Sequence, residues 1–255
     1  MLLQNSLNTL FSLFLSLALS VNLYAETYTE SGELHGLFTE VLQTHVKNGH
    51  VDYSGIKNDL RFTEYLKTIE LGEPDTLVTE AEKLAFWINA YNALAIKGIL
   101  DGLSPGTFWS RISYFKSTKY ELGSITISLY DLEHKIIIPF KDPRIHFAIV
   151  CASLSCPKLR SEAYLATRLN EQLDDNAIDF INDQQKNEID LNNKPLRLSK
   201  IFLWFKTDFE KHSGSVQKYI SNFVTDDARK QHLLEKNHRI NFLKYDWNLN
   251  GTLAD

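Results

Sequence analysis

The sequence predicts an α+β fold, in which a single helix-rich domain surrounds a small, partly antiparallel sheet. Three observations support this prediction. Segments with helical spacing of apolar residues outnumber segments with strand spacing, and one pair of strand patterns is spaced as a hairpin. No low-complexity linker or internal repeat divides residues 26–255. With 44% hydrophobic and 23% charged residues, the 255-residue chain can bury a sizeable core.

The first 25 residues differ from the rest of the chain. They carry no charged side chain, and their apolar centre, residues 10–21, has the length of a secretory h-region rather than of a membrane span. Ala25 is a small residue at a possible cleavage position, and charges begin at Glu26. The alternative is an N-terminal membrane anchor. We favour a signal peptide over residues 1–25, which predicts a periplasmic or extracellular domain with no stable membrane span.

Helical patterns dominate the first half of that domain. Residues 35–46 and 59–69 have apolar side chains at helical spacing, with a turn and a short extended piece between them at 48–55. The best-defined helix is predicted over 79–102, where the first residues fit a capping box. This helix is apolar nearly all round, which is typical of a buried helix.

Strand patterns appear in the second half. Apolar residues alternate over 125–129 and 145–151, and residues 188–199 fit a hairpin. Three further helices are predicted, over residues 168–183, 199–211 and 215–223. The chain then ends as a strand running into a tail that contains Trp247.

Charge and motifs exclude several classes of function. The net charge is −5, so no basic face for nucleic acid is expected. The sequence contains no P-loop, dinucleotide fingerprint, GxSxG or HExxH motif. We therefore predict no cofactor and no nucleic-acid partner, and the sequence does not define an oligomeric state.

Residues 142–157, DPRIHFAIVCASLSCP, contain both cysteines of the chain beside acidic and basic side chains. One hypothesis is a thiol nucleophile with a histidine base and a third group that orients the base. The candidate nucleophiles are Cys156 and Cys151. The candidate bases are His146 and His134, and the candidate orienting groups are Asn89, Asn92 and Asp142.

Spacing limits these roles. His146 and Cys151 are five residues apart, so they would point to opposite faces of a regular strand. Cys151 alone fits a core position better, whereas Cys156 lies in a loop. A disulfide is the second alternative, because so short a loop can bring two α-carbons within bonding range. A Cys2His2 zinc set with His134 is a weaker third, and we predict no metal.

Polar residues of the helix predicted over 79–102 and of residues 142–157 also have structural interpretations. Asn89 and Asn92 lie three apart on one helix face, so each needs hydrogen-bond partners if it is buried. Asp142 and Arg144 are close enough for an ion pair. Four aromatic residues are expected to form core or cleft walls: Trp204, Phe205, Phe209 and Trp247.

Five motifs occur in order: AFWINAYNAL, DLEHKII, DPRIHFAIVCASLSCP, LSKIFLWFKTDFE and YDWNLNG. Together they resemble the family of domain of unknown function 547, over about residues 45–250. The resemblance implies an exported bacterial protein or a plant domain and brings no settled reaction. Two functions remain open. One is a thiol-dependent hydrolase or transferase acting on a peptide, an amide or a thiol-containing small molecule. The other is a non-catalytic binding or scaffolding domain with a buried polar network.

Overall fold

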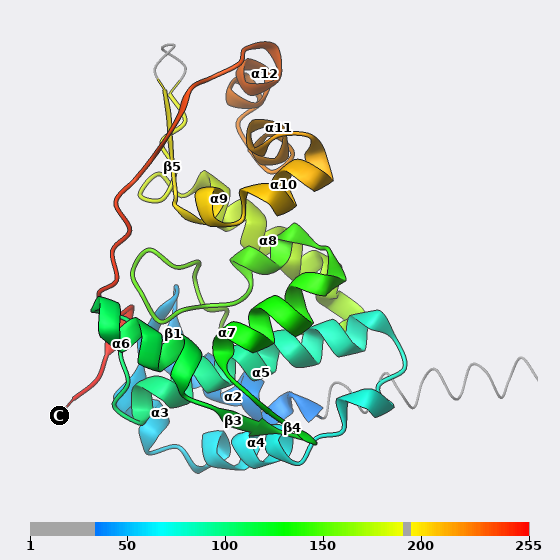
Figure 1. Cartoon of the computed structure of the whole chain (residues 1–255), viewed down its shortest axis with the longest axis vertical. Helices are drawn as coiled ribbons and strands as arrows, with labels where there is room; N and C mark the ends of the chain where they lie inside the picture. Colours follow the sequence, from blue (N-terminus) through cyan, green and yellow to red (C-terminus); the bar gives the residue numbers. More distant parts are fainter. Residues whose placement is uncertain (1–33, 191–194, 255) are drawn as a thin grey trace, which may run out of the picture.

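The computed structural model describes residues 34–190 and 195–254, in which helices predominate over short strands (Figure 1). This confirms the helix-rich α+β class. The signal peptide predicted over residues 1–25 lies outside the described residues. Within the described ranges, no helix combines the length and the apolar character that crossing a membrane requires.

The bounds of the elements agree with most of the predicted segments. The α-helices are α2 Gly36–His45, α3 Tyr53–Lys57, α4 Leu60–Glu70, α5 Glu80–Leu100, α6 Phe108–Ile112, α7 Leu129–Asp131, α8 Leu169–Asn182, α9 Ile201–Trp204, α10 Lys206–Ser213, α11 Val216–Ser221 and α12 Asp227–Glu235. The π-helical turns are η2 Ser113–Ser117 and η3 Leu132–Ile137. The 3-10 turns are η1 Pro74–Thr76, η4 Ile138–Phe140, η5 Pro143–Phe147 and η6 Ala166–Arg168.

The described strands form three small sheets. They are β1 Val46–Lys47, β2 His50–Asp52, β3 Tyr120–Leu122, β4 Ile125–Ile127, β5 Leu196–Leu198, β6 Ile240–Phe242 and β7 Gly251–Thr252. β1 and β2 are antiparallel, and β7 adds to β2 in parallel. β3 and β4 form an antiparallel hairpin, whereas β5 and β6 are parallel. Of the hairpin predicted over 188–199, the described residues show one antiparallel bridge, between Glu188 and Arg197, and the predicted turn lies outside them.

Helix α5 forms the centre of the first hydrophobic core, together with α2, α3 and α4. The predicted capping box is confirmed. Glu82 N–H donates to the Thr79 hydroxyl at 3.1 Å, and Thr79 N–H donates to the Glu82 carboxylate at 2.8 Å. These bonds satisfy amides that have no partner inside the helix. Since α5 is buried on nearly all sides, side chains along it can organise the loops around it.

A second core lies in the upper half of Figure 1, where α8 to α11 pack around Phe147 and Phe209. The chain passes from this half back to the first one through residues 236–254, which we call the C-terminal strap (Figure 1). β6 of the strap pairs with β5 in the upper half, and β7 pairs with β2 in the lower half. The strap therefore connects the two cores along one side.

The strand predicted over 145–151 is wrong, because this segment starts as the 3-10 turn η5. Asp142 accepts a hydrogen bond from Arg144 N–H, and Pro143 occupies the first position of the turn, which favours a helical start. The backbone that follows bonds to Asn92 of α5 instead of to a neighbouring strand. The helix predicted over 199–211 is divided at Phe205 into α9 and α10.

Candidate functional site

Cys151 and Cys156 form a disulfide, the second of the three sequence alternatives, with their α-carbons 6.1 Å apart. Neither sulfur is therefore a free thiol in this state. A nucleophilic role for Cys151 or Cys156 would first require reduction of this bond. A Cys2His2 zinc set would require the same reduction, because zinc binds thiolates.

The C-terminal strap holds the disulfide loop in place. Leu154 N–H donates to the Asn248 carbonyl at 2.8 Å, and Ser155 N–H donates to the Asp246 carbonyl at 3.1 Å. Within the loop, Ala152 has a left-handed backbone with φ 56°. A left-handed alanine is uncommon and persists only where its surroundings fix it, as at many functional sites.

The two sulfurs have several hydrogen-bond partners. The Tyr245 hydroxyl lies 3.2 Å from Cys151 Sγ and 3.3 Å from Cys156 Sγ. The Ser153 hydroxyl lies 3.1 Å from Cys151 Sγ and 3.5 Å from Cys156 Sγ. Cys151 N–H donates to Cys156 Sγ at 2.9 Å. Burial raises the pKa of Tyr245 well above its usual range, so its hydroxyl stays protonated and can donate.

The disulfide borders a cavity of about 500 Å³, large enough for a small molecule. Both cysteines line it, and most of the other lining side chains are apolar or aromatic. Trp204 and Trp247 stack with their ring centres 5.8 Å apart, and the centre of the Tyr245 ring lies 4.5 Å from that of Trp247. The remaining aromatic wall consists of Tyr91, Phe108, Phe115, Tyr130 and Phe205. We call this cavity the disulfide pocket.

Glu133 is an unusual lining residue of the disulfide pocket. It belongs to the π-helical turn η3, and its side chain is only 13% exposed. Among the described residues, the one basic group within ion-pair distance of its carboxyl group is His134, with Nδ1 3.9 Å away. Burial raises the pKa of Glu133 to about 8, because an apolar site disfavours the charged form. The carboxyl group is therefore mostly protonated at pH 7.

His134 also lines the disulfide pocket. Its Nδ1 lies 3.0 Å from the Tyr130 carbonyl oxygen, and its ring stacks on the Tyr130 ring at 3.9 Å. A carbonyl oxygen only accepts, so Nδ1 carries the hydrogen and Nε2 is left as an acceptor. Burial lowers the pKa of His134, which favours this neutral form at pH 7.

Two cations lie on the aromatic wall of the disulfide pocket. The Arg111 guanidinium lies 4.6 Å from the centre of the Trp247 ring, and Lys116 Nζ lies 4.3 Å from the centre of the Tyr130 ring. Both distances are typical of cation–π contacts. Within the described part of the chain, neither cation forms an ion pair with a carboxylate. Since Glu133 and His134 are mostly neutral at pH 7, the pocket carries positive charge.

Asn89 and Asn92 do not orient a histidine, contrary to the sequence hypothesis. The Asn89 amide donates to the Tyr164 carbonyl and accepts from Tyr164 N–H, both at 2.8 Å. Asn92 donates to the Ala148 carbonyl at 3.0 Å and accepts from Val150 N–H at 2.9 Å. Each amide thus both donates and accepts a bond that fixes a loop to α5.

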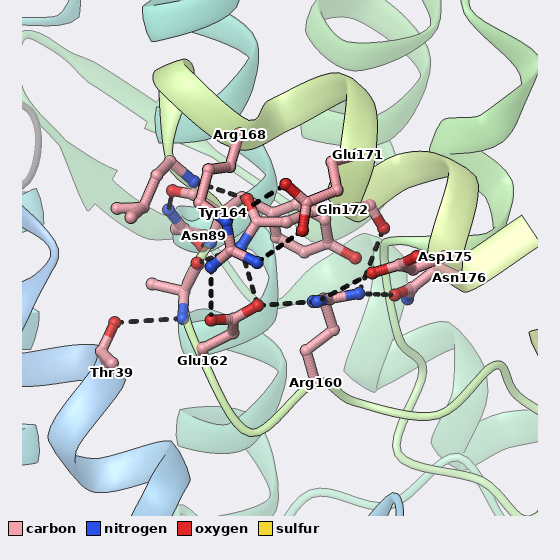
Figure 2. Close-up of polar contacts among 12 residues, drawn as sticks. Thr39, Asn89, Arg160, Glu162, Tyr164, Arg168, Glu171, Gln172, Asp175 and Asn176 are labelled. Carbon is pink, nitrogen blue, oxygen red and sulfur yellow. Dashed lines mark hydrogen bonds and ion pairs between the residues drawn. The ribbon is translucent and has the colours of Figure 1, made fainter.

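Asn89 forms one end of a larger polar cluster around the start of α8 (Figure 2). There Glu162 pairs with Arg160 at 2.7 Å and with Arg168 at 3.0 Å. The Gln172 amide donates to the Ala163 carbonyl at 2.9 Å. These contacts hold the loop that carries Tyr164, so the cluster is structural and lies apart from the disulfide pocket.

His146 and Asp142 are also placed differently from the sequence hypothesis. His146 Nε2 lies 3.0 Å from the Asp208 carboxylate, and its ring stacks on Phe205 at 3.8 Å. Its partner is therefore Asp208 and not a sulfur, although it lines one side of the disulfide pocket. Asp142 forms the predicted ion pair with Arg144, at 2.6 Å, and does not orient a histidine.

Sequence reasoning missed several residues of the site. Tyr245 and Asp208 lie inside two of the five motifs, and this position could have marked them as candidate site residues. Arg111 and Lys116 lie outside the motifs and had no comparable signal. Of the aromatic residues expected as core or cleft walls, Phe209 is in the second core, whereas Trp204 and Trp247 line the pocket.

Residues 75–181 match the family model described as "Protein of unknown function, DUF547". The resemblance to DUF547 is confirmed. The DUF547 match contains α5, Glu133, His134 and the disulfide loop, whereas the C-terminal strap lies beyond it. It is also shorter than the resemblance predicted over 45–250. No curated protein and no solved structure matches the chain.

Proposed function

We propose that the protein is an exported binding protein, whose disulfide pocket holds a small molecule or peptide side chain with an apolar body and an acidic group. The observation that carries this proposal is the aromatic pocket itself, since an apolar cavity with a few polar groups is the usual form of a ligand site. The thiol-dependent hydrolase or transferase is supported less well, because both sulfurs are bonded to each other.

The charges of the pocket support an acidic ligand. Arg111 and Lys116 lie on the aromatic wall, and no carboxylate among the described residues neutralises them. Glu133 lines the same cavity but is mostly uncharged at pH 7. An anion near the two cations would therefore meet attraction, and the described pocket lining holds no carboxylate other than Glu133 to oppose it.

The dye 8-anilinonaphthalene-1-sulfonate is a suitable probe, because it combines aromatic rings with an anionic sulfonate. We expect the folded protein to bind it with energy transfer from Trp204 and Trp247. Trp247→Ala should weaken binding about tenfold or more, since a large, half-buried aromatic side chain of the pocket wall is removed. Arg111→Gln should weaken it less. Fluorescence titration measures both effects.

The matched control is Trp109→Ala. Trp109 is 77% exposed and lies outside the pocket lining, so its loss should leave the dye affinity unchanged. Equal affinity of wild type and Trp247→Ala would contradict the proposal, as would dye binding that appears only in denaturant.

Export is tested separately. The charge-free apolar start motivates the expectation that the mature protein begins at Glu26. N-terminal sequencing of the protein purified from its native source measures this directly. A mature chain that retains Met1 would contradict the proposed export.

A further inference from the structure

We propose that the Cys151–Cys156 disulfide is a reactive group that exchanges with apolar thiols entering the disulfide pocket. The inference rests on the proposed function for the entry of the thiol, and it adds a chemical reaction to binding. The first observation is position. Both sulfurs line a cavity wide enough for a small molecule, and accessible disulfides are the ones that tend to be labile or catalytic.

The hydrogen bonds around the sulfurs distinguish their roles. The Tyr245 and Ser153 hydroxyls lie within hydrogen-bond distance of both sulfurs, whereas Cys151 N–H donates to Cys156 Sγ alone, at 2.9 Å. Donors of this kind stabilise a thiolate, as does any hydrogen bond to a charged group. Cys156 is therefore the sulfur suited to leave. Cys151 is the more exposed of the two, and it is the sulfur suited to be attacked.

A proton acceptor is present in the same cavity. Since Nδ1–H of His134 donates to the Tyr130 carbonyl, Nε2 carries a lone pair, and no described residue donates to it. In the first step the incoming thiol gives its proton to this nitrogen, and its sulfur bonds to Cys151 Sγ. The bond between the two cysteines breaks, its electron pair stays on Cys156, and that sulfur takes the proton from His134.

A second thiol completes the exchange. Its sulfur attacks the substrate sulfur of the mixed disulfide, and Cys151 leaves and takes its proton. Two substrate thiols are thereby oxidised to one substrate disulfide, and the protein disulfide is reduced to two thiols. The left-handed backbone of Ala152 accords with a loop that is held under constraint beside the reacting bond.

The experiment uses the full oxidised protein with two thiol probes of similar acidity, benzyl mercaptan and 2-mercaptoethanol. Samples are quenched with acid, alkylated and analysed by mass spectrometry. We expect benzyl mercaptan to open the disulfide about tenfold faster or more, and to form its mixed disulfide on Cys151. Tyr245→Phe should slow both probes about tenfold, because one donor to the leaving thiolate is lost.

Tyr120→Phe is the matched control, since the Tyr120 hydroxyl is buried, lies outside the pocket and has no hydrogen-bond partner among the described residues. It should react as wild type does. Equal rates for the two probes, or opening only under unfolding conditions, would overturn the inference. Dye binding by the oxidised protein is independent of exchange. If the dye binds and the thiols do not react, this inference alone fails.

Discussion

Replacement of Glu133 by glutamine is expected to stabilise the protein at pH 8 to 9. Burial raises the pKa of Glu133 from 4.5 to about 8 in the folded protein. Each pKa unit corresponds to ~1.4 kcal/mol, so the penalty is at most about 5 kcal/mol. Partial exposure and local relaxation reduce it, and we expect a gain of roughly 2–4 kcal/mol in the free energy of unfolding.

The direction of the pH dependence of stability follows from proton binding in the folded and unfolded states. Between pH 4.5 and about 8 the folded state keeps the Glu133 proton and the unfolded state does not, so this contribution to stability falls as pH rises. Below pH 4.5 both states are protonated and the two proteins should differ little. Urea unfolding of wild type and Glu133→Gln at pH 4 and pH 9 measures the difference.

Glu64→Gln is the control, since Glu64 is exposed on α4. Its substitution should leave the pH dependence of stability as in wild type. The same free energy of unfolding for wild type and Glu133→Gln at pH 9 would contradict the buried, protonated state. A residue that lowers stability at neutral pH and is nevertheless present at a pocket is typical of a functional group.

Asn92→Leu should destabilise the protein by roughly 2–5 kcal/mol, because it leaves two buried backbone groups without partners. These are the Ala148 carbonyl and Val150 N–H, which bond to the Asn92 amide at 3.0 and 2.9 Å. Leucine adds apolar surface but cannot replace either bond. Thermal and urea unfolding measure the loss, with Asn222→Leu, at an exposed position, as the comparison. An unchanged or higher melting temperature for Asn92→Leu would show that the amide does not fix this loop.

Local signals were sufficient to predict α5. Its start depends on Thr79 and Glu82, which are three residues apart, and its burial follows from apolar side chains on nearly all its faces. The need of Asn89 and Asn92 for partners also followed from burial alone, and their bonds to loops confirm it. Their partners could not be named, because those loops lie more than fifty residues further along the chain.

The same long-range bonds explain what the sequence did not predict. Residues 145–151 alternate like a strand, yet Asn92 satisfies the backbone at Ala148 and Val150, so no neighbouring strand is needed. The disulfide pocket depends on the C-terminal strap, whose Tyr245 reaches Cys156 across 89 residues. The motifs that contain these residues were visible, but their convergence depends on how the strap crosses between the two cores.

The most direct test of the disulfide pocket as a ligand site is a crystal structure of the oxidised protein with bound 8-anilinonaphthalene-1-sulfonate. We expect the rings of the dye beside Trp204 and Trp247, the sulfonate near Arg111 or Lys116, and the Glu133 side chain facing the ligand. Density for the dye only on an outer surface, with the disulfide pocket closed by protein side chains, would contradict the proposal.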